Sequence, residues 1–342
     1  MAKFKGFGLD RFSGVYLWVI FIVVFSVLSP EIFPTMSTVH LIASTQAVSA
    51  IVALALLVPF VSGQFDLSVG ATANLAGLIA ATTQTRMGVS PFAAVGLALL
   101  VGVGVGLLNS FIIVRLRVDS FIATLGSSAI IAAFQIMVTD NAEPQPVVNS
   151  TWDAITQTSV FGFQLVVVFM LVAAVAVWWF LEKTPGGRFM RASGSNPEAA
   201  RLAGVKVNRW ATTSLLISGV LSALAGTLFV SLAGPSLTFG TSLLLPAFAA
   251  VFLGTTQLVP GRANVWGTLL AIFVLATGVQ GLQLVTGVQW VAQMFNGVAL
   301  ILAVALAVGR AQRRPRGRRR GSPPADPVAE EALPAAPAPA VT

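Results

Sequence analysis

The chain has 342 residues, of which 56% are hydrophobic and only 9% carry a charge, and its mean hydropathy is +0.87. About a quarter of the residues in soluble domains are charged, so this composition excludes an ordinary soluble domain and predicts a membrane protein. The chain contains no cysteine, which excludes disulfide frameworks, thiolate zinc sites and thiol nucleophiles. Residues 1–309 and 310–342 contribute equally to the net charge of +8.

The chain begins with a basic segment, MAKFKGFGLDR (1–11), which is followed by an uncharged run over 12–30. The same pattern describes a signal peptide, but no small-residue cleavage site follows and many more apolar runs do. We therefore predict a cytoplasmic segment over 1–11 and a first membrane span after it.

Further apolar runs follow along the chain, and each spanning helix needs about 20 mostly apolar residues. The third predicted span is rich in small and polar residues. Gly234-Pro235 and Thr286-Gly287 divide the two longest uncharged intervals, because Gly and Pro interrupt helices. The predicted spans are 12–30, 39–61, 67–85, 92–114, 120–138, 164–181, 211–233, 242–258, 264–284 and 290–309.

The charge distribution supports ten spans, because Lys and Arg are enriched in cytoplasmic loops. With both termini in the cytoplasm, all of the 20 basic residues except Arg86 fall inside. Removing the third span would place Arg115, Arg117 and the loop 182–209 on the wrong face. The loop 139–163 carries acidic but no basic residues and is assigned to the outside. The expected fold is an all-α polytopic membrane protein with a transmembrane domain over 12–309.

The segment 310–342 is rich in Arg, Pro and Ala. It has too few large apolar residues to bury a core, so we predict a disordered cytoplasmic tail. Its cluster RAQRRPRGRRR (310–320) follows a span directly and lacks interleaved aromatic residues. We therefore expect it to bind anionic lipid rather than nucleic acid.

The polar segment GSNPEAARLAG (194–204) predicts a short helix within the cytoplasmic loop 182–210. Asn196 is a favourable N-cap, Pro197 suits the first helical position, and Glu198 complements the positive end of the helix. Gly204 marks its end. An ordinary capped loop helix and a contact surface for a partner both fit this pattern.

Four stretches carry a family resemblance. FMRASGSNPEAARLAGVKVNRW (189–210) resembles the cytoplasmic signature of ABC-importer permeases of the ribose-type and branched-chain amino-acid superfamily. SGQFDLSVGATANLAG (62–77) and VDSFIATLGSSAI (118–130) resemble further segments of the sugar branch. FLGTTQLVPGRANVWGTLLA (252–271) is similar to the glycine-rich region of that family, although Gln257, Leu258 and Val259 partly replace the glycine-rich run. The resemblance covers roughly residues 40–309.

The resemblance implies a type II ABC-importer-like permease in the bacterial plasma (inner) membrane. It would translocate a ribose-like sugar or another monosaccharide in an ATP-driven importer, without catalysing a reaction and without holding a cofactor. The implied partners are an ABC ATPase subunit that carries ATP and Mg²⁺, an extracytoplasmic sugar-binding protein, and a second permease copy or a homologous permease. The residues implied to contact the ATPase are Asn196, Pro197, Glu198, Ala199, Ala200, Arg201 and Gly204.

The sequence shows no ATP-hydrolysing domain, because it lacks the glycine-rich loop ending in Gly-Lys-Ser/Thr that holds nucleotide phosphates. GVGVG (102–106) lies inside an apolar span, where Gly102 and Gly106 suit close helix packing. The one histidine, His40, falls near the external start of the second span and is interpreted as interfacial. Trp178 and Trp179 are interpreted as anchors at the cytoplasmic boundary.

Asp66 is embedded between apolar blocks, so it is a candidate functional residue, but it also precedes the third span and suits a capping role. Polar residues within lipid need partners or water, and these either line a pathway or join helices. The candidate pathway or packing residues are Asp66, Ser68, Asn74, Asn109, Ser127, Ser128 and Gln135.

Three other functions compete with sugar import. An ion-coupled secondary transporter needs an ionisable residue deep in the membrane, for which only Asp66 is available. Within the resembling superfamily, autoinducers, nucleosides and amino acids are alternative substrates. A membrane-embedded enzyme is disfavoured by the single histidine and the absence of cysteine.

Overall fold

A computed structural model describes residues 9–313, with side chains over 12–307. The predictions for the first eight residues and for the tail beyond Arg313 lie outside the described residues. Ten long helices lie close to the ten predicted spans. They are α1 (Leu9–Leu28), α2 (Met36–Val61), α3 (Val69–Met87), α4 (Pro91–Ser110) with its π-helical continuation η1 (Phe111–Arg115), α5 (Ser120–Thr139), α7 (Leu165–Lys183), α10 (Val207–Ala233), α11 (Phe239–Gly254), α12 (Val265–Thr286) and α13 (Trp290–Arg313).

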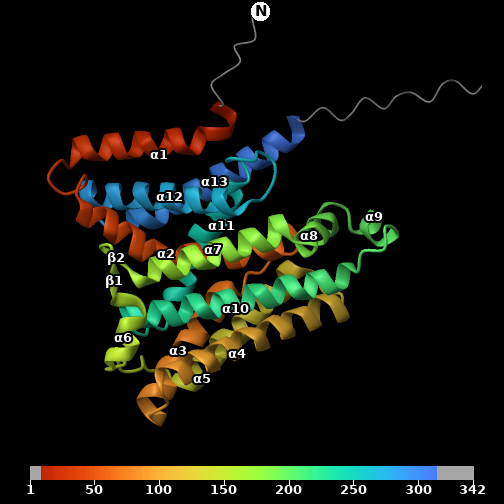
Figure 1. Cartoon of the computed structure of the whole chain (residues 1–342), viewed down its shortest axis with the longest axis horizontal. Helices are drawn as coiled ribbons and strands as arrows, with labels where there is room; N and C mark the ends of the chain where they lie inside the picture. The colour runs from red at the N-terminus through yellow and green to blue at the C-terminus, as the bar shows by residue number, and fades with distance from the viewer. Residues whose placement is uncertain (1–8, 314–342) are drawn as a thin grey trace, which may run out of the picture.

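The helices form three groups in one bundle (Figure 1). On one side α1 packs on α12, and α11 packs on α12 and α13. On the other side α3 packs against α4 and α5. Between these groups lie α2, α7 and α10. Every residue of α2 from Ala47 to Pro59 is buried. This part of α2 is in contact with protein on all sides, which explains why it is apolar on nearly every face.

The hydropathy of the helices follows their surroundings. Seven of the helices within residues 9–313 are long and apolar enough to cross a membrane, and the apolar parts of α1 and α11 are shorter. The helix α3 lies among α4, α5, α10 and α11, and most of its residues are buried. Since α3 faces protein rather than lipid, small and polar residues suit it better than large apolar ones.

The predicted breaks between the later spans are confirmed. Helix α10 ends at Ala233 and is followed by Gly234 with φ of +87°. Helix α12 ends at Thr286, where Gly287 adopts a left-handed conformation. Positive φ is readily available to glycine, which explains why the chain reverses at these two positions.

The loop expected to lie outside contains elements that the sequence did not predict. The short helix α6 (Ser150–Gln157) is followed by an antiparallel pair, β1 (Ser159–Val160) and β2 (Phe163–Gln164). His40 packs edge-on against Phe163 with ring centroids 4.6 Å apart. Arg86, the one basic residue assigned to this side, forms an exposed ion pair with Asp140 at 2.7 Å, so its charge is locally compensated.

The replacement of glycine by Gln257 has a structural role in the turn between α11 and α12. The Gln257 Oε1 atom accepts the backbone N–H of Gly14 at 2.6 Å and the hydroxyl of Ser13 at 3.2 Å. Trp18 Nε1 donates to Thr277 Oγ1 at 2.8 Å. The long side chain of Gln257 therefore joins the start of α1 to this turn, while Trp18 joins α1 to α12.

Glycines bring α4 into backbone contact with α10. A Cβ atom added at Gly102 would overlap the carbonyl oxygen of Gly219, and one added at Gly106 would lie 2.8 Å from the carbonyl oxygen of Leu215. At Gly104, by contrast, an added Cβ would meet nothing within 4 Å. The packing interpretation of GVGVG is confirmed for Gly102 and Gly106.

We expect Gly102→Val to destabilise the protein by about 1–3 kcal/mol or more, because overpacking a close helix contact forces the backbones apart. Gly104→Val is the matched control on the same helix, and we expect it to unfold at the temperature of the wild type. Thermal unfolding of the purified proteins in detergent measures both. Equal unfolding temperatures for the two variants would contradict the close contact between α4 and α10.

Candidate functional site

The predicted polar helix is present as α9 (Pro197–Leu202), with the expected boundaries and capping. Asn196 Oδ1 accepts the backbone N–H of Ala199 at 3.0 Å, and Pro197 occupies the first turn together with Glu198. Gly204 has φ of +82° directly after the helix. Because side-chain and backbone groups satisfy its ends, this short helix has a defined shape.

One face of α9 projects away from the bundle (Figure 1). Leu202 is 91% exposed, whereas Ala200 is only 5% exposed. Ala200 is therefore the one residue of the predicted contact surface that is buried, because its side chain faces inward. Leu202 was left out of the predicted surface, although a lone large apolar residue in a polar loop helix is a usable signal. The exposed residues of this segment are Asn196, Pro197, Glu198, Ala199, Arg201, Leu202, Ala203 and Gly204.

A second helix, α8 (Pro185–Ser195), precedes α9 and was not predicted. The Thr184 hydroxyl accepts the backbone N–H of Gly187 at 3.3 Å, so Thr184-Pro185 repeats the N-cap and proline pattern of Asn196-Pro197. That repeat was an overlooked signal. The inner face of α8 buries Gly186, Gly187, Met190 and Ser193.

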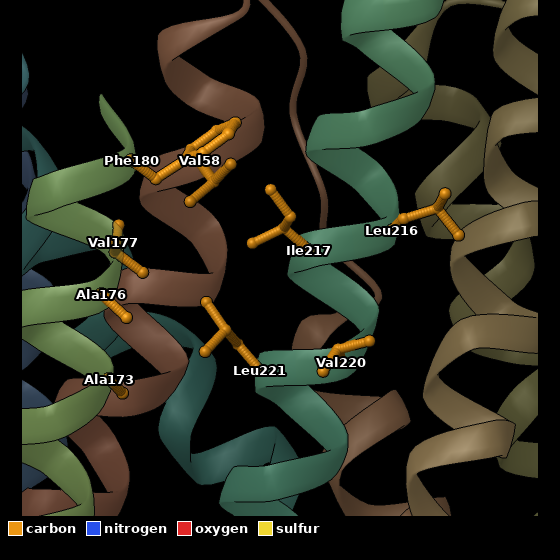
Figure 2. A pocket seen from close by; sticks show the side chains of 9 residues that line it. All are labelled: Val58, Ala173, Ala176, Val177, Phe180, Leu216, Ile217, Val220 and Leu221. Carbon is orange, nitrogen blue, oxygen red and sulfur yellow. The ribbon is translucent and has the colours of Figure 1, made fainter. Parts of the chain in front are cut away.

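Helix α7, which precedes α8, and helix α10, which follows α9, lie apart from each other. An apolar groove of about 310 Å³ separates α7 from α10, with Val58 of α2 between them (Figure 2). Phe180 and Val177 of α7 face the groove from one side, and Ile217 and Leu221 of α10 face it from the other. Because α7 and α10 do not pack closely here, the position of the α8–α9 segment depends on the contacts of α8 with each of these helices and with the rest of the bundle. Phe189 of α8, for example, packs against Trp210 of α10 with ring centroids 5.6 Å apart.

Residues 62–68, between α2 and α3, are not helical and lie among the helices. The backbone N–H of Phe65 donates to Ser120 Oγ at 3.1 Å, and that of Leu67 donates to Thr124 Oγ1 at 3.0 Å. Backbone N–H groups buried among helices need hydrogen-bond partners. The α5 hydroxyls meet that requirement for 62–68, which we call the broken-helix segment.

Asp66 lies at the centre of the broken-helix segment and is 3% exposed. Its Oδ1 atom accepts the backbone N–H and the hydroxyl of Ser68 at 3.0 and 2.6 Å. Its Oδ2 atom accepts the Ser218 hydroxyl at 2.7 Å, about three turns from the first residue of α10. Asn109 Nδ2 donates to Ser68 Oγ at 2.8 Å. Asp66 thus stabilises the turn before α3 and joins this turn to α10 and, through Ser68, to α4. It does not cap α3 as the capping interpretation expected, because Ser68 occupies the N-cap position and no side chain caps that helix start.

A second polar cluster lies farther along α3. Asn74 Nδ2 donates to Gln135 Oε1 at 3.0 Å and to the carbonyl oxygen of Leu237 at 2.6 Å. Gln135 Nε2 donates to the carbonyl oxygen of Ala71 at 2.9 Å. The Oδ1 atoms of Asn74 and Asn109 are buried without a protein partner.

The remaining candidates are not part of either cluster. The hydroxyls of Ser127 and Ser128 donate to carbonyl oxygens of their own helix, Thr124 and Leu125, at 3.1 and 2.7 Å. Of the predicted polar residues, the structure therefore brings together Asp66, Ser68 and Asn109 in one cluster, and Asn74 and Gln135 in the other.

An ion cluster that the sequence did not predict lies beside α8. Glu182, near the end of α7, forms an ion pair with Arg191 of α8 and a second one with Arg262 at 3.0 Å. Arg191 Nη1 also donates to the carbonyl oxygen of Ala263 at 3.0 Å. Burial lowers the pKa of the Arg191 guanidinium, and the Glu182 carboxylate raises it; an arginine stays protonated in proteins. Partners so far apart in sequence leave no local pattern.

The chain matches characterised transport proteins over most of its length. The ribose import permease protein RbsC of Bacillus subtilis is 30% identical over 301 residues, which is 86% of this chain and 91% of that protein. RbsC of Escherichia coli K12 is 30% identical over 304 residues, covering 88% and 94% of the two chains. The fructose import permease protein FrcC of Rhizobium meliloti is 31% identical over 298 residues, covering 84% and 82%. No solved structure matches the chain significantly.

The family model for the permease component of branched-chain amino acid transport systems matches residues 39–304. This range begins within α2, ends within α13, and includes α8, α9 and the broken-helix segment. Together with the apolar helices, the match makes the chain a multi-pass membrane protein. The chain belongs to the permease family described as the branched-chain amino acid transport system permease component.

Proposed function

We propose that this chain is the membrane-spanning subunit of an ATP-driven importer and that it translocates a monosaccharide such as ribose or fructose. The observation that carries the proposal is α9, a capped and exposed helix that connects the transmembrane helices α7 and α10 through α8. Relatives named for ribose and fructose import match 86% and 84% of the chain. A relative named for autoinducer 2 import, LsrD of Photorhabdus laumondii, is 29% identical over 300 residues and makes that substrate the second candidate.

The polar groups in the bundle suit a neutral solute. The clusters around Asp66 and Asn74 consist of hydroxyls, amides and one carboxylate. Both Asp66 oxygens accept hydrogen bonds from Ser68 and Ser218, so the carboxylate is engaged in holding helices together. An ion-coupled carrier would need this group to bind and release an ion, which favours ATP-driven transport of an uncharged sugar.

The arrangement of the helix ends supports ten crossings with α9 in the cytoplasm. The start of α1 is bonded to the α11–α12 turn through Gln257, and Arg262 of that turn is paired with Glu182 beside α8. These segments therefore share one end of the bundle. With ten alternating crossings, α6 and the β1–β2 pair lie at the other end, which we assign to the outside of the cell. The basic residues of the α8–α9 segment and Arg262 lie at the α9 end, in agreement with the positive-inside rule.

The proposed partners follow from this orientation. An ABC ATPase subunit contacts the exposed face of α9, where Glu198 and Arg201 provide charged rim groups and Leu202 an apolar anchor. An extracytoplasmic sugar-binding protein delivers the substrate at the α6 end. A second permease copy or a homologous permease completes the pathway, and the Arg-rich tail meets anionic lipid. ATP and Mg²⁺ bind to the ATPase.

Cysteine labelling tests the orientation, because the natural chain has no cysteine. We expect a membrane-impermeant maleimide to label Phe161→Cys, 98% exposed beside β2, in right-side-out membrane vesicles. Leu202→Cys should be labelled only after the membrane is permeabilised. Labelling of Leu202→Cys in sealed vesicles would refute the cytoplasmic placement of α9.

Reconstitution tests the energy source and the substrate. With the ATPase and the binding protein, proteoliposomes should accumulate radiolabelled ribose or fructose with ATP but not with its non-hydrolysable analogue. Ionophores that collapse ion gradients should not change this uptake. Asp66→Asn should retain ATP-driven uptake, because the Ser68 and Ser218 hydroxyls can accept a hydrogen bond from the new amide group as well as donate one to it. Uptake that needs an ion gradient and is lost in Asp66→Asn would instead identify an ion-coupled carrier.

Substitution of Leu202 tests the ATPase contact. We expect Leu202→Asp to reduce the amount of ATPase that copurifies with the permease by at least about tenfold, because replacing a central apolar anchor costs about 2 kcal/mol or more. Phe161→Asp is the matched control, since it makes the same kind of change at an exposed residue of the opposite end. Undiminished copurification with Leu202→Asp would remove α9 from the interface.

A further inference from the structure

The α8–α9 segment packs on its two flanking helices, α7 and α10, and further contacts join it to the rest of the bundle. The apolar groove separates α7 from α10 on either side of α2 (Figure 2). A force applied to α9 would be dissipated if the segment could tilt between two separate helices. The contacts of α8 with the rest of the bundle therefore decide where such a force goes.

The first anchor is Arg191. Its guanidinium pairs with Glu182 of α7 and donates to the carbonyl oxygen of Ala263, just before α12. Glu182 in turn pairs with Arg262 at 3.0 Å. The side chain of Arg191 is 16% exposed, whereas that of Arg262 is 47% exposed. An arginine that bonds two partners in a planar fork orients them precisely, so Arg191 joins α8 to both α7 and the α11–α12 turn.

The second anchor is Gly194, near the last residue of α8. A Cβ atom added at Gly194 would overlap the carbonyl oxygen of Val61, and one added at Gly63 would lie 3.1 Å from the Cα atom of Gly194. Backbone thus touches backbone where α2 gives way to the broken-helix segment. No side chain lies between them that could yield, so a displacement of one is transmitted to the other.

Beyond this contact, hydrogen bonds spread from the broken-helix segment to three helices. Ser62 Oγ lies 2.8 Å from Ser214 Oγ of α10. The backbone N–H groups of Phe65 and Leu67 donate hydrogen bonds to hydroxyls of α5. The Asp66 carboxylate accepts a hydrogen bond from Ser218 of α10. Ser68, which also donates to Asp66, accepts one from Asn109 of α4. A continuous set of contacts therefore runs from α8 to the polar cluster inside the bundle.

We propose that Arg191 and Gly194 are positioning residues that make α8 and α9 move as one body with the α11–α12 turn and the broken-helix segment. A displacement of α9 then reaches the polar cluster around Asp66 instead of tilting α8. The inference rests on the proposed ATPase contact of α9, but neither residue belongs to the exposed α9 surface. Both are needed to convert ATP hydrolysis into transport and neither is needed to bind the ATPase.

Proteoliposomes that contain the complete transporter test this role through the sugar taken up per ATP hydrolysed. We expect Arg191→Met and Gly194→Ala each to lower that ratio by about tenfold, within the range of coupling between protein sites. Copurification of the ATPase should change by less than about twofold, a difference below 0.5 kcal/mol. Arg188→Met is the matched control, because Arg188 is an exposed residue of α8 that forms no ion pair with the acidic side chains described between residues 12 and 307.

Arg191→Lys should restore part of the ratio, because it keeps the charge next to Glu182 but loses the forked contact with Ala263. An unchanged ratio in both Arg191→Met and Gly194→Ala would overturn the proposal. Loss of ATPase copurification in these variants would overturn it as well, since the residues would then serve docking or folding. If the wild type shows no ATP-dependent uptake, the proposed function fails separately. In that case, hydrogen exchange of residues 185–204 in the isolated permease tests whether Arg191 and Gly194 anchor α8. The proposal requires these amides to exchange faster in Arg191→Met and in Gly194→Ala than in the wild type, and at the wild-type rate in Arg188→Met.

Discussion

The structure depends on one constraint, which is that backbone N–H and C=O groups buried among helices need hydrogen-bond partners. The chain breaks its helices at 62–68 and must satisfy those groups with protein. The hydroxyls of Ser120 and Thr124 accept hydrogen bonds from the backbone N–H groups of Phe65 and Leu67. The Asp66 carboxylate accepts one from the backbone N–H of Ser68. Helices α4, α5 and α10 therefore surround this break, and α3 beyond it is enclosed and needs little hydrophobicity of its own.

Close approach of the helices is the second condition for this enclosure. Glycines at the crossings of α10 with α3 and α4 let carbonyl oxygens lie where a Cβ atom would otherwise sit, as at Gly102 and Gly219. Dispersion and short-range hydrogen bonds drive helix association in lipid, and both need short distances. The same principle appears at Gly63 and Gly194, where it joins the membrane bundle to the α8–α9 segment rather than two spans.

In the function we propose, α9 must keep its shape when it contacts the ATPase, and α8 must transmit a displacement of α9 to the bundle. The cap at Asn196 stabilises α9, and the contacts of Arg191 and Gly194 fix α8 to the bundle. The apolar groove separates α7 from α10, so the packing of α8 on each of these helices is supplemented by its contacts with the α11–α12 turn and with the end of α2.

Local features of the sequence determined the positions of the long helices, the breaks at Gly234 and Gly287, and the capped helix starting after Asn196. These features could be predicted because span length, helix capping and glycine conformation depend on neighbouring residues. Tertiary structure alone decided that Ala200 faces inward, that Asp66 reaches Ser218, and that Glu182 joins Arg191 to Arg262. These outcomes depend on which helix faces meet, and residues far apart in sequence carry no periodic or spacing signal for that.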